Sequence, residues 1–458
     1  MTIESIREAF ELSKEQFEQI VKGFKNEYEQ GLNTAEAKGL ATMIPSYVTK
    51  LPTGQERGTF LALDLGGSTL RVCAVELLGN GKVNVKEMKR SIPMTDPLRQ
   101  GHVDPFFDWI AETVELLLKE YHIDHKNTAL SMGVSWSFPI DQTSVSDGTI
   151  LRMGKGFDLK GIIGKDLKSL FTDAFKRKKI NVKVSALVND TVGVLVAHAY
   201  SNPKSRIGFI YGTGTNAAYP EKISKMVKLK ATNHYHQDEE MLVNTEIDIF
   251  GSESYLPLNR FDLHLDQHHN QPKFQLYEKM MSGGYLGELV RLAALELINE
   301  KVLFHGCTPL EFKEMYLFDS SKLSDIESQA NQPLNVKSSY IQSLFTFDTN
   351  YLLTEQDVEI IIELCLLVAT RGAKLAGAAI ASLIEQQAHL LLIKDDQQPI
   401  VIGVNGSTYE LYPQMPSRIL NSLSDWFGTE IAHRIQLEVA RDGASIGSAL
   451  IAMLYTEE

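Results

Sequence analysis

The sequence predicts an α/β protein whose two domains face each other across a central cleft. The first reason is its length, because 458 residues are more than one compact hydrophobic core usually holds. The second reason is that a strand-like run followed by a glycine-rich turn occurs twice, near residue 64 and near residue 211. The third reason is that helical patterns lie between and after these runs, as in α/β architectures. We therefore expect one domain around each turn.

The first half of the chain alternates strand and helix patterns. An amphipathic helix is predicted over residues 14–30, where Ser13 and Gln16 form a capping-box pattern and Gly31 suits the helix end. The other predicted elements are strands at Thr59–Leu65, Leu70–Leu77, 83–93, Ala129–Trp136 and Val184–Val188, helices at Asp104–Tyr121 and Gly161–Lys178, and a helix after Asp190. The short turn between the first two strands predicts a hairpin.

The second half begins with another strand, at Arg206–Tyr211, which leads into the second glycine-rich turn. Long helical stretches follow, and a further strand is predicted at Pro399–Val404. The segment Leu364–Ile384 is rich in Ala, Leu and Ile, but two basic residues interrupt it, so we expect a buried helix and not a membrane span. Residues 318–350 are rich in Ser, Asn and Gln, and we expect them to form a surface excursion.

The overall composition excludes several classes of function. A formal net charge of -13 argues against nucleic acid or an anionic membrane as the main partner. Cys73, Cys307 and Cys365 are far apart and form no CxxC pair, so neither a disulfide framework nor a zinc site is indicated. The N-terminus has no apolar run of the kind that a secretory signal needs. We therefore expect a cytoplasmic protein in a reducing compartment.

The first glycine-rich turn lies within residues 64–71, DLGGSTLR. Its two glycines after a strand allow backbone amides to approach an anion closely. Ser68 and Thr69 add hydroxyl donors, and Arg71 adds a cation. Asp64 is a candidate ligand for magnesium through a water molecule. An ordinary hairpin turn would also explain these residues.

The second glycine-rich turn consists of Gly212, Thr213, Gly214, Thr215 and Asn216, again at the end of a predicted strand. Each turn alone is weak evidence, because such turns are common. Two of them in two domains are better explained as a pair that clamps one polyphosphate.

Asp190 stands in the sequence Asn189-Asp190-Thr191, at the end of a predicted buried strand. Ligands bind outside the carboxyl ends of strands in α/β sheets. A carboxylate there can accept the proton of a hydroxyl group during phosphoryl transfer. Helix N-capping is the structural alternative, and one residue pair can do both.

Further polar residues are candidate sugar ligands. Ser137 and Lys155 lie near one predicted loop region, and Glu246 and Glu278 are carboxylates that can each accept two hydroxyl hydrogen bonds. Taken one at a time, each of these residues is better explained by an ordinary structural or solvated role.

Taken together, these segments resemble the eukaryotic hexokinase family, especially fungal glucokinases and fungal N-acetylglucosamine kinases. The resemblance runs from about Met43 to about Ile451. The motifs that carry it are MIPSYV, FLALDLGGSTLRV, SWSFPIDQT, GKGFDLKG, ALVNDTVG, GTGTNAAY, FQLYEKMMSGGYLGELVRL, NGSTYELYP and RDGASIGSAL. An ordered series of this length is highly specific.

The resemblance implies a two-domain fold related to actin and the heat-shock ATPases. The small domain would hold residues 60–207 and 441–458, and the large domain residues 1–59 and 208–440. ATP and Mg²⁺ would be the cofactors, and a hexose or an N-acetylhexosamine would be the substrate. We expect a monomer or a homodimer without nucleic acid or membrane partners.

The resemblance also implies a role for each matching residue. Asp190 would be the catalytic base, with Lys155 as a nearby cation. The implied sugar ligands are Ser137, Lys155, Asn189, Asp190, Asn216, Glu246 and Glu278. The implied ATP-binding residues are Asp64, Gly66, Gly67, Ser68, Thr69, Arg71, Gly212, Thr213, Gly214, Thr215, Gly406, Ser407, Gly443 and Ser445, of which the last four would lie near the adenosine.

The chain departs from the family pattern at four places. Ser68-Thr69 replaces Thr-Asn, which keeps a hydroxyl group, and Asn405 replaces an aspartate. Gly154 replaces a threonine, which removes one hydroxyl group from the sugar loop. Ile247-Asp248 replaces an aromatic residue and a glycine after Glu246. Our hypothesis is that the changes at residues 154 and 247–248 make room for a 2-acetamido group.

The favoured prediction is therefore transfer of the ATP γ-phosphoryl group to the 6-hydroxyl of N-acetylglucosamine, with glucose a close second. A hexokinase-like regulator without catalytic activity is the alternative from another class. The altered sugar loops favour the regulator. The retained Asp190 and Lys155, together with both glycine turns, argue against it.

Overall fold

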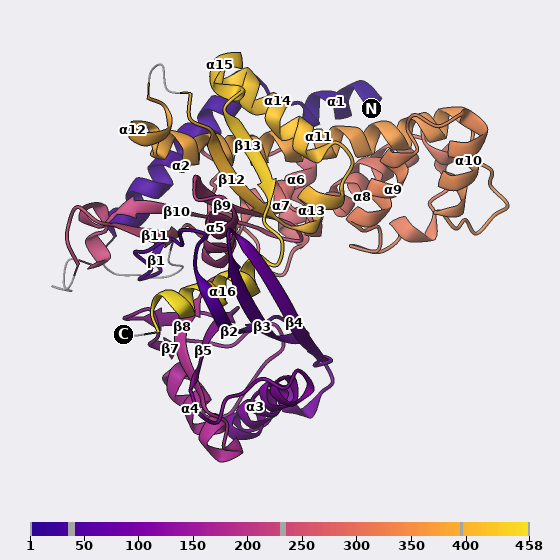
Figure 1. Cartoon of the computed structure of the whole chain (residues 1–458). Helices are drawn as coiled ribbons and strands as arrows, with labels where there is room; N and C mark the ends of the chain where they lie inside the picture. Colours follow the sequence, from indigo (N-terminus) through magenta and orange to yellow (C-terminus); the bar gives the residue numbers. More distant parts are fainter. Residues whose placement is uncertain (1, 35–41, 230–234, 394–396, 457–458) are drawn as a thin grey trace.

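Two β-sheets organise the chain in the computed structural model, which describes residues 2–34, 42–229, 235–393 and 397–456 (Figure 1). The five-stranded sheet has the order β4-β3-β2-β5-β8, and the six-stranded sheet has the order β1-β11-β10-β9-β12-β13. Both sheets are mixed, with an antiparallel part and a parallel part. The predicted α/β class is confirmed.

The five-stranded sheet consists of β2 (Arg57–Leu65), β3 (Thr69–Gly79), β4 (Lys82–Ser91), β5 (Leu130–Trp136) and β8 (Val182–Val188). β2 and β3 form the predicted hairpin, in which Asp64 pairs with Arg71, and β2, β5 and β8 run parallel. Residues alternate between the two faces of the sheet. Leu61 and Leu63 contact the core shared with α3 (Val103–Glu120) and α4 (Leu167–Lys178), whereas Ala62 contacts α16 (Gly443–Leu454).

The six-stranded sheet consists of β1 (Ile44–Pro45), β9 (Ser205–Tyr211), β10 (Thr215–Lys222), β11 (Glu240–Asn244), β12 (Ile400–Asn405) and β13 (Ile435–Val439). One large core joins it to α2 (Lys14–Asn33), α7 (Leu276–Met281), α8 (Gly283–Asn299), α11 (Glu355–Gln386) and α14 (Met415–Phe427). α5 (Asp190–Ser201) and α16 lie between the two sheets, because their core includes Ala62 of one sheet and Ala218 of the other (Figure 1).

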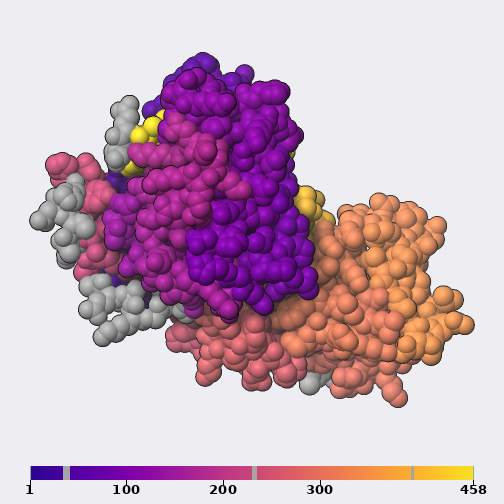
Figure 2. All heavy atoms as spheres, turned by 90° about the horizontal axis from the view of Figure 1, so that it is seen from below, coloured from indigo at the N-terminus to yellow at the C-terminus, as the bar shows by residue number. Residues whose placement is uncertain are grey.

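The remaining elements surround these sheets. They are α1 (Ile3–Phe10), α6 (Arg260–His268), α9 (Ser320–Ser328), α10 (Leu334–Ser343), α12 (Ala388–Leu391), α13 (Ser407–Leu411), α15 (Thr429–Ala432), the hairpin of β6 (Ile140–Gln142) and β7 (Gly148–Ile150), and short 3₁₀ helices at Pro97–Arg99, Ile223–Lys225, Val227–Leu229, Ile247–Ile249, Phe304–Gly306 and Leu310–Phe312. The predicted surface excursion at residues 318–350 is helical, and α9 and α10 project from one end of the molecule (Figures 1 and 2).

Two predicted helix boundaries are wrong. α2 begins with the expected capping box at Ser13, but it continues through Gly31, which is buried inside the helix. A Cβ on Gly31 would lie 2.5 Å from the Met43 side chain, so this glycine allows close packing and does not end the helix. The helix predicted from Gly161 begins only at Leu167, because Gly161 and Gly164 both have positive φ.

The apolar segment Leu364–Ile384 lies within α11, most of whose residues are buried. Arg371 inside it forms a buried ion pair with Asp262, at 2.7 Å. In the part of the chain that the structure describes, no helix has both the length and the apolar character needed to cross a membrane. The predicted buried helix is confirmed. The domain boundaries predicted from the sequence stay a prediction.

Candidate active site

Three of the predicted site residues lie at one edge of the five-stranded sheet. Asp64 near the end of β2 pairs with Ser135 of β5, and Ser135 pairs with Val188 of β8. Ser137 follows β5 directly, and Asp190 follows β8 after one residue. The carboxyl ends of adjacent parallel strands thus bring these three positions together, in the region where α/β sheets bind ligands.

Asp190 is the first residue of α5, and Asn189 is its N-cap, with a side chain that accepts a hydrogen bond of 2.9 Å from the Thr191 amide. The Asp190 carboxylate accepts a hydrogen bond of 3.2 Å from the Thr191 hydroxyl. Its side chain is exposed to solvent, yet desolvation by the surrounding protein raises its pKa. The carboxylate is thus accessible to solvent and yet has protein packed around it. The capping role and the catalytic role are therefore compatible.

Lys155 lies between Asp190 and the first glycine turn. Its charge acts to lower the pKa of both Asp190 and Asp64, although desolvation is stronger and leaves both pKa values raised. The aliphatic part of the side chain lies against Gly67, whose Cβ would be 3.3 Å from Lys155 Cδ. The ammonium group is exposed and lies 5.8 Å from the centre of the Phe138 ring. Among the residues that the structure describes, no carboxylate forms an ion pair with this ammonium group, which suits the predicted role beside a phosphoryl group.

The first glycine turn is tight, because the Gly66 amide donates to the Thr69 carbonyl at 3.0 Å. Ser68 and Thr69 are exposed and available to a ligand. Arg71 differs from expectation. Its Nε donates to Glu87 at 2.6 Å, and its Nη2 donates to Asp442 at 2.7 Å. Two carboxylates therefore already neutralise this guanidinium, which ties the five-stranded sheet to the start of α16.

The second glycine turn is held on several sides. The Gly283 amide and the Thr408 hydroxyl both donate to the Gly212 carbonyl at 2.8 Å, and the Gly284 amide donates to the Thr213 carbonyl at 2.9 Å. Gly406 packs against the same turn, since its Cβ would lie 2.4 Å from the carbonyl carbon of Tyr211. The residues predicted at 212–215 and 406–407 are thus packed against one another. Thr213 and Ser407 are exposed.

Gly443 and Ser445 are both buried at the start of α16. A Cβ on Gly443 would lie 2.6 Å from the Val194 side chain of α5. The structure thus gives Gly443 a packing role at the contact between α5 and α16.

Four carboxylates form an acidic cluster: Asp190, Glu246, Asp248 and Glu278. Desolvation raises the pKa of Glu246, Asp248 and Glu278, in the last case to about 7. Mutual repulsion adds to this effect, because Asp190 and Asp248 raise the pKa of Glu246, and Asp248 raises that of Glu278. The fold therefore brings Glu246, Glu278 and Asp190 into one interacting cluster, and their role as sugar ligands stays a prediction.

Hydrogen bonds orient the members of this acidic cluster. Asn216 Nδ2 donates to Asn244 Oδ1 at 2.9 Å, and both amides donate to Glu246 Oε1. Glu278 accepts from the Thr215 amide at 2.9 Å. The Glu278 carboxylate also covers Gly214, whose Cβ would lie 2.6 Å from Glu278 Oε2. The predicted sugar ligands and the second glycine turn are thus in direct contact.

Asp248 is the member of the acidic cluster that differs from the family pattern, which has a glycine at this position. Its Oδ2 accepts a hydrogen bond of 2.7 Å from Gln275 Nε2. Its Oδ1 is buried and has no partner among the residues that the structure describes. A buried acceptor without a donor is costly, so this oxygen is well suited to receive a donor from a ligand.

Sequence reasoning missed three residues that hold the site together. Asn244 and Gln275 orient Glu246 and Asp248, and Arg99 donates to the carbonyls of both Gly67 and Lys155. An exposed polar residue and an internal supporting residue look alike in a sequence. Only the pattern NTE, in which Asn244 lies two residues before Glu246, offered a signal.

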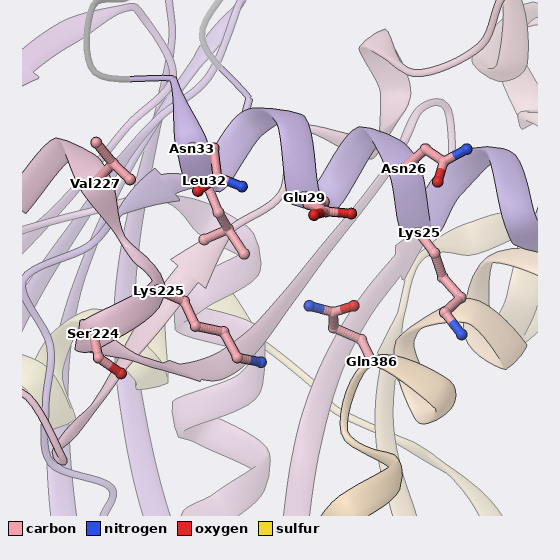
Figure 3. Close-up of a pocket in the computed structure, with 9 residues that line it drawn as sticks. All are labelled: Lys25, Asn26, Glu29, Leu32, Asn33, Ser224, Lys225, Val227 and Gln386. Atoms are coloured by element: carbon pink, nitrogen blue, oxygen red, sulfur yellow. The ribbon is translucent and has the colours of Figure 1, made fainter.

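A cavity of about 480 Å³ lies elsewhere, between α2, the end of α11 and residues 224–227 (Figure 3). Its lining includes Lys25 and Lys225, which project toward it. Lys25 pairs with Glu385 at 2.8 Å, and Lys225 pairs with Glu221 at 3.0 Å. Both cations are therefore already neutralised, and none of the predicted site residues lines this cavity.

Comparisons with known proteins identify the family. Two sequence profiles, both described as hexokinase, match residues 2–200 and 206–454. Hexokinase-1 of Schizosaccharomyces pombe is 33% identical over 454 residues, which are 99% of this chain and 90% of the relative. Hexokinase-1 of Spinacia oleracea is 34% identical over 442 residues, which are 96% of this chain and 87% of the relative.

Solved structures give the same result. A hexokinase from Schistosoma mansoni complexed with glucose superposes with a TM-score of 0.81 at 33% identity, covering 98% of this chain and 97% of that one. A second hexokinase crystal structure superposes with a TM-score of 0.84 at 29% identity and covers 98% of both chains.

Proposed function

The chain belongs to the hexokinase family, and from this premise we propose that it transfers the γ-phosphoryl group of ATP to the 6-hydroxyl of N-acetylglucosamine. The family membership makes it a phosphotransferase of the hexokinase type with the two-domain actin-like fold. The observation that carries the proposed site is the position of Asp190, which is exposed and close enough to Lys155 and Asp64 for their charges to interact.

Asp190 acts as the general base. Desolvation raises its pKa toward the operating pH, which strengthens it as an acceptor of the 6-hydroxyl proton. Lys155 and the two glycine turns stabilise negative charge on the phosphoryl group in the transition state. Sugar binding closes the cleft and excludes water, which limits wasteful hydrolysis of ATP.

Magnesium fits the donor set at Asp64. This carboxylate lies near Asp190, and desolvation together with the charge of Asp190 raises its pKa. A hard divalent cation prefers such oxygen ligands and the phosphates of ATP. Asp64 would hold Mg²⁺ through water, and the ion when bound neutralises charge on the β- and γ-phosphates.

Two features favour N-acetylglucosamine as the acceptor. A Cβ on Gly154 would meet no atom within 4 Å, so this position leaves open space where the family pattern has a threonine. Where the family pattern has a glycine, Asp248 supplies a buried oxygen that has no hydrogen-bond partner within the described part of the chain. We propose that the open space accepts the 2-acetamido group and that Asp248 accepts its N–H.

Glucose is the second candidate, and it is consistent with the relatives to which the chain is similar. The curated relatives carry the name hexokinase, and the solved relative from Schistosoma mansoni is complexed with glucose. An assay of ADP release with glucose, mannose, fructose and N-acetylglucosamine tests which sugar is the preferred acceptor. We expect the highest kcat/KM with N-acetylglucosamine. A preference for glucose of more than about tenfold, or about 1.4 kcal/mol of transition-state binding, would reverse this ranking.

Asp190→Asn is the decisive variant in the same assay. The amide keeps the size and the N-terminal position of the side chain in α5, so we expect normal folding and sugar binding. Because an amide cannot take the hydroxyl proton, kcat should fall by about 10²–10⁴-fold. Retention of most of the activity would show that another group is the base.

A regulator without catalytic activity stays the alternative from another class. Its signature would be ATP binding together with no turnover on any of the four sugars.

We place the enzyme in the cytoplasm, because Cys73, Cys307 and Cys365 are free thiols, as expected in a reducing compartment.

A further inference from the structure

Arg99 is among the largest side chains that the fold buries completely, with 0% of its surface exposed. It ends the 3₁₀ helix Pro97–Arg99, in the connection between β4 and α3. A buried arginine usually has a carboxylate partner. Among the residues that the structure describes, no carboxylate forms an ion pair with Arg99. Charge pairing therefore does not explain why Arg99 is buried.

Backbone carbonyls hold the guanidinium instead. Nε donates to Pro93 O at 2.8 Å and to Ile92 O at 3.1 Å, and Nη2 donates to Ile92 O at 2.7 Å. Nη1 donates to Lys155 O at 2.7 Å, and Nη2 also donates to Gly67 O. The donors of a guanidinium point in fixed directions from one plane. The four carbonyl groups are thus fixed relative to one another.

Two of these carbonyls belong to the loops that form the proposed site. Gly67 lies in the first glycine turn, and the Gly67 and Lys155 segments are in direct contact. Lys155 has a φ of 53°, which is uncommon for a residue with a side chain and needs support from its surroundings.

Arg99 supplies that support from two directions. Its side chain bonds the Lys155 carbonyl, and its own carbonyl accepts from the Asp158 amide at 2.8 Å. The guanidinium also stacks on the Phe157 ring, 4.2 Å from its centre. Both sides of the 155–158 loop are therefore anchored to one residue, which is anchored in turn to the glycine turn.

We propose that Arg99 is a positioning residue for phosphoryl transfer, which fixes the Lys155 ammonium relative to the phosphate turn at residues 66–69. The inference rests on the proposed roles of Lys155 and of this turn. Arg99 acts only through them, because it is fully buried behind both loops. A displacement of about 1 Å in such a group can cost about 10²-fold in rate.

The test compares Arg99→Met with Arg90→Met in the full chain. Arg90 is a matched control, because it lies on β4 shortly before Arg99, stacks on Trp109 at 4.8 Å and donates to Thr113. Among the described residues, no hydrogen bond or ion pair joins its side chain to either loop. We expect Arg99→Met to lower kcat by about 10²-fold, whereas Arg90→Met should stay within about threefold of the unmodified protein.

A double-mutant cycle separates positioning from a general structural role. In a Lys155→Met background there is no ammonium to position, so Arg99→Met should cost less than about tenfold. The same loss of about 10²-fold in both backgrounds would overturn the proposal, as would a folded Arg99→Met enzyme within about threefold of the unmodified kcat.

Arg99→Lys decides the question if Arg99→Met does not fold. A lysine keeps the charge, but it cannot bond the carbonyls of both loops in the fixed geometry of a guanidinium. We expect a loss of about tenfold in kcat that disappears in the Lys155→Met background, and an unchanged kcat would contradict the proposal. If the unmodified enzyme is active and Asp190→Asn is not, a negative result with Arg99 leaves the proposed function intact.

Discussion

Single residues of the acidic cluster are held in an environment that disfavours their charge. Glu278 shows this clearly, because desolvation and the charge of Asp248 raise its pKa from 4.5 to about 7. The folded protein therefore binds this proton more tightly than the unfolded chain does. The stability that results is fully present below pH 4.5, and it is lost as the pH rises through 7.

Glu278→Gln should accordingly change stability only at higher pH. The variant has nothing to titrate, so we expect it to match the unmodified protein at pH 4.5 and to exceed it at pH 8 by about 1–3 kcal/mol, since one pKa unit is worth about 1.4 kcal/mol. Urea unfolding at the two pH values measures the difference, with the exposed Glu8→Gln as the control. A stabilising effect at pH 4.5 and none at pH 8 would have the wrong sign.

At the scale of elements, the contact between α5 and α16 positions the proposed base. Glycines line this contact. A Cβ on Gly447 would lie 2.0 Å from the Gly193 carbonyl oxygen, and one on Gly193 would lie 3.1 Å from the Gly443 carbonyl oxygen. Because Asp190 begins α5, a shift at this contact changes the place of the carboxylate.

Gly447→Ala tests this contact. Alanine would favour the helix by about 1 kcal/mol, but the overlap is with backbone, which no side-chain rotation relieves. We expect a net loss of about 1–3 kcal/mol in the free energy of unfolding, together with a lower kcat. The control is Gly377→Ala in α11, whose Cβ would lie 2.0 Å from the hydroxyl oxygen of Ser422, a group that can rotate. Equal losses for the two variants would argue against the role of backbone contact.

Elements also differ in how well the sequence predicts them. The capping box of α2 and the β2–β3 hairpin were predicted correctly, because each depends on a few neighbouring residues. The start of α4 was wrong, because local helix propensity competes there with two glycines of positive φ that lie at residues 161 and 164. The role of Gly31 was wrong, because its contact with Met43 comes from a segment beyond the helix.

At the scale of the whole molecule, two sheets and the helices between them bring together residues from distant parts of the chain. Asp64 lies on β2 of the five-stranded sheet and Asp190 begins the helix that follows β8, while Glu246 and Glu278 come from the other half of the chain. The repulsion between Asp190 and Glu246 is therefore a property of the assembled fold. It raises the pKa of Glu246 although 55 positions of sequence, from 191 to 245, separate the two residues.

The sequence by itself determined the α/β class, the family and the identity of the residues at the proposed site, because motifs such as ALVNDTVG and GTGTNAAY are local and specific. Tertiary structure alone decided the partners of those residues. Arg71 is occupied by Glu87 and Asp442, and Arg99 joins two loops from within the core. The physical reason is that charge pairing and burial depend on which atoms meet in space, whereas a motif records only which residues are neighbours in the chain.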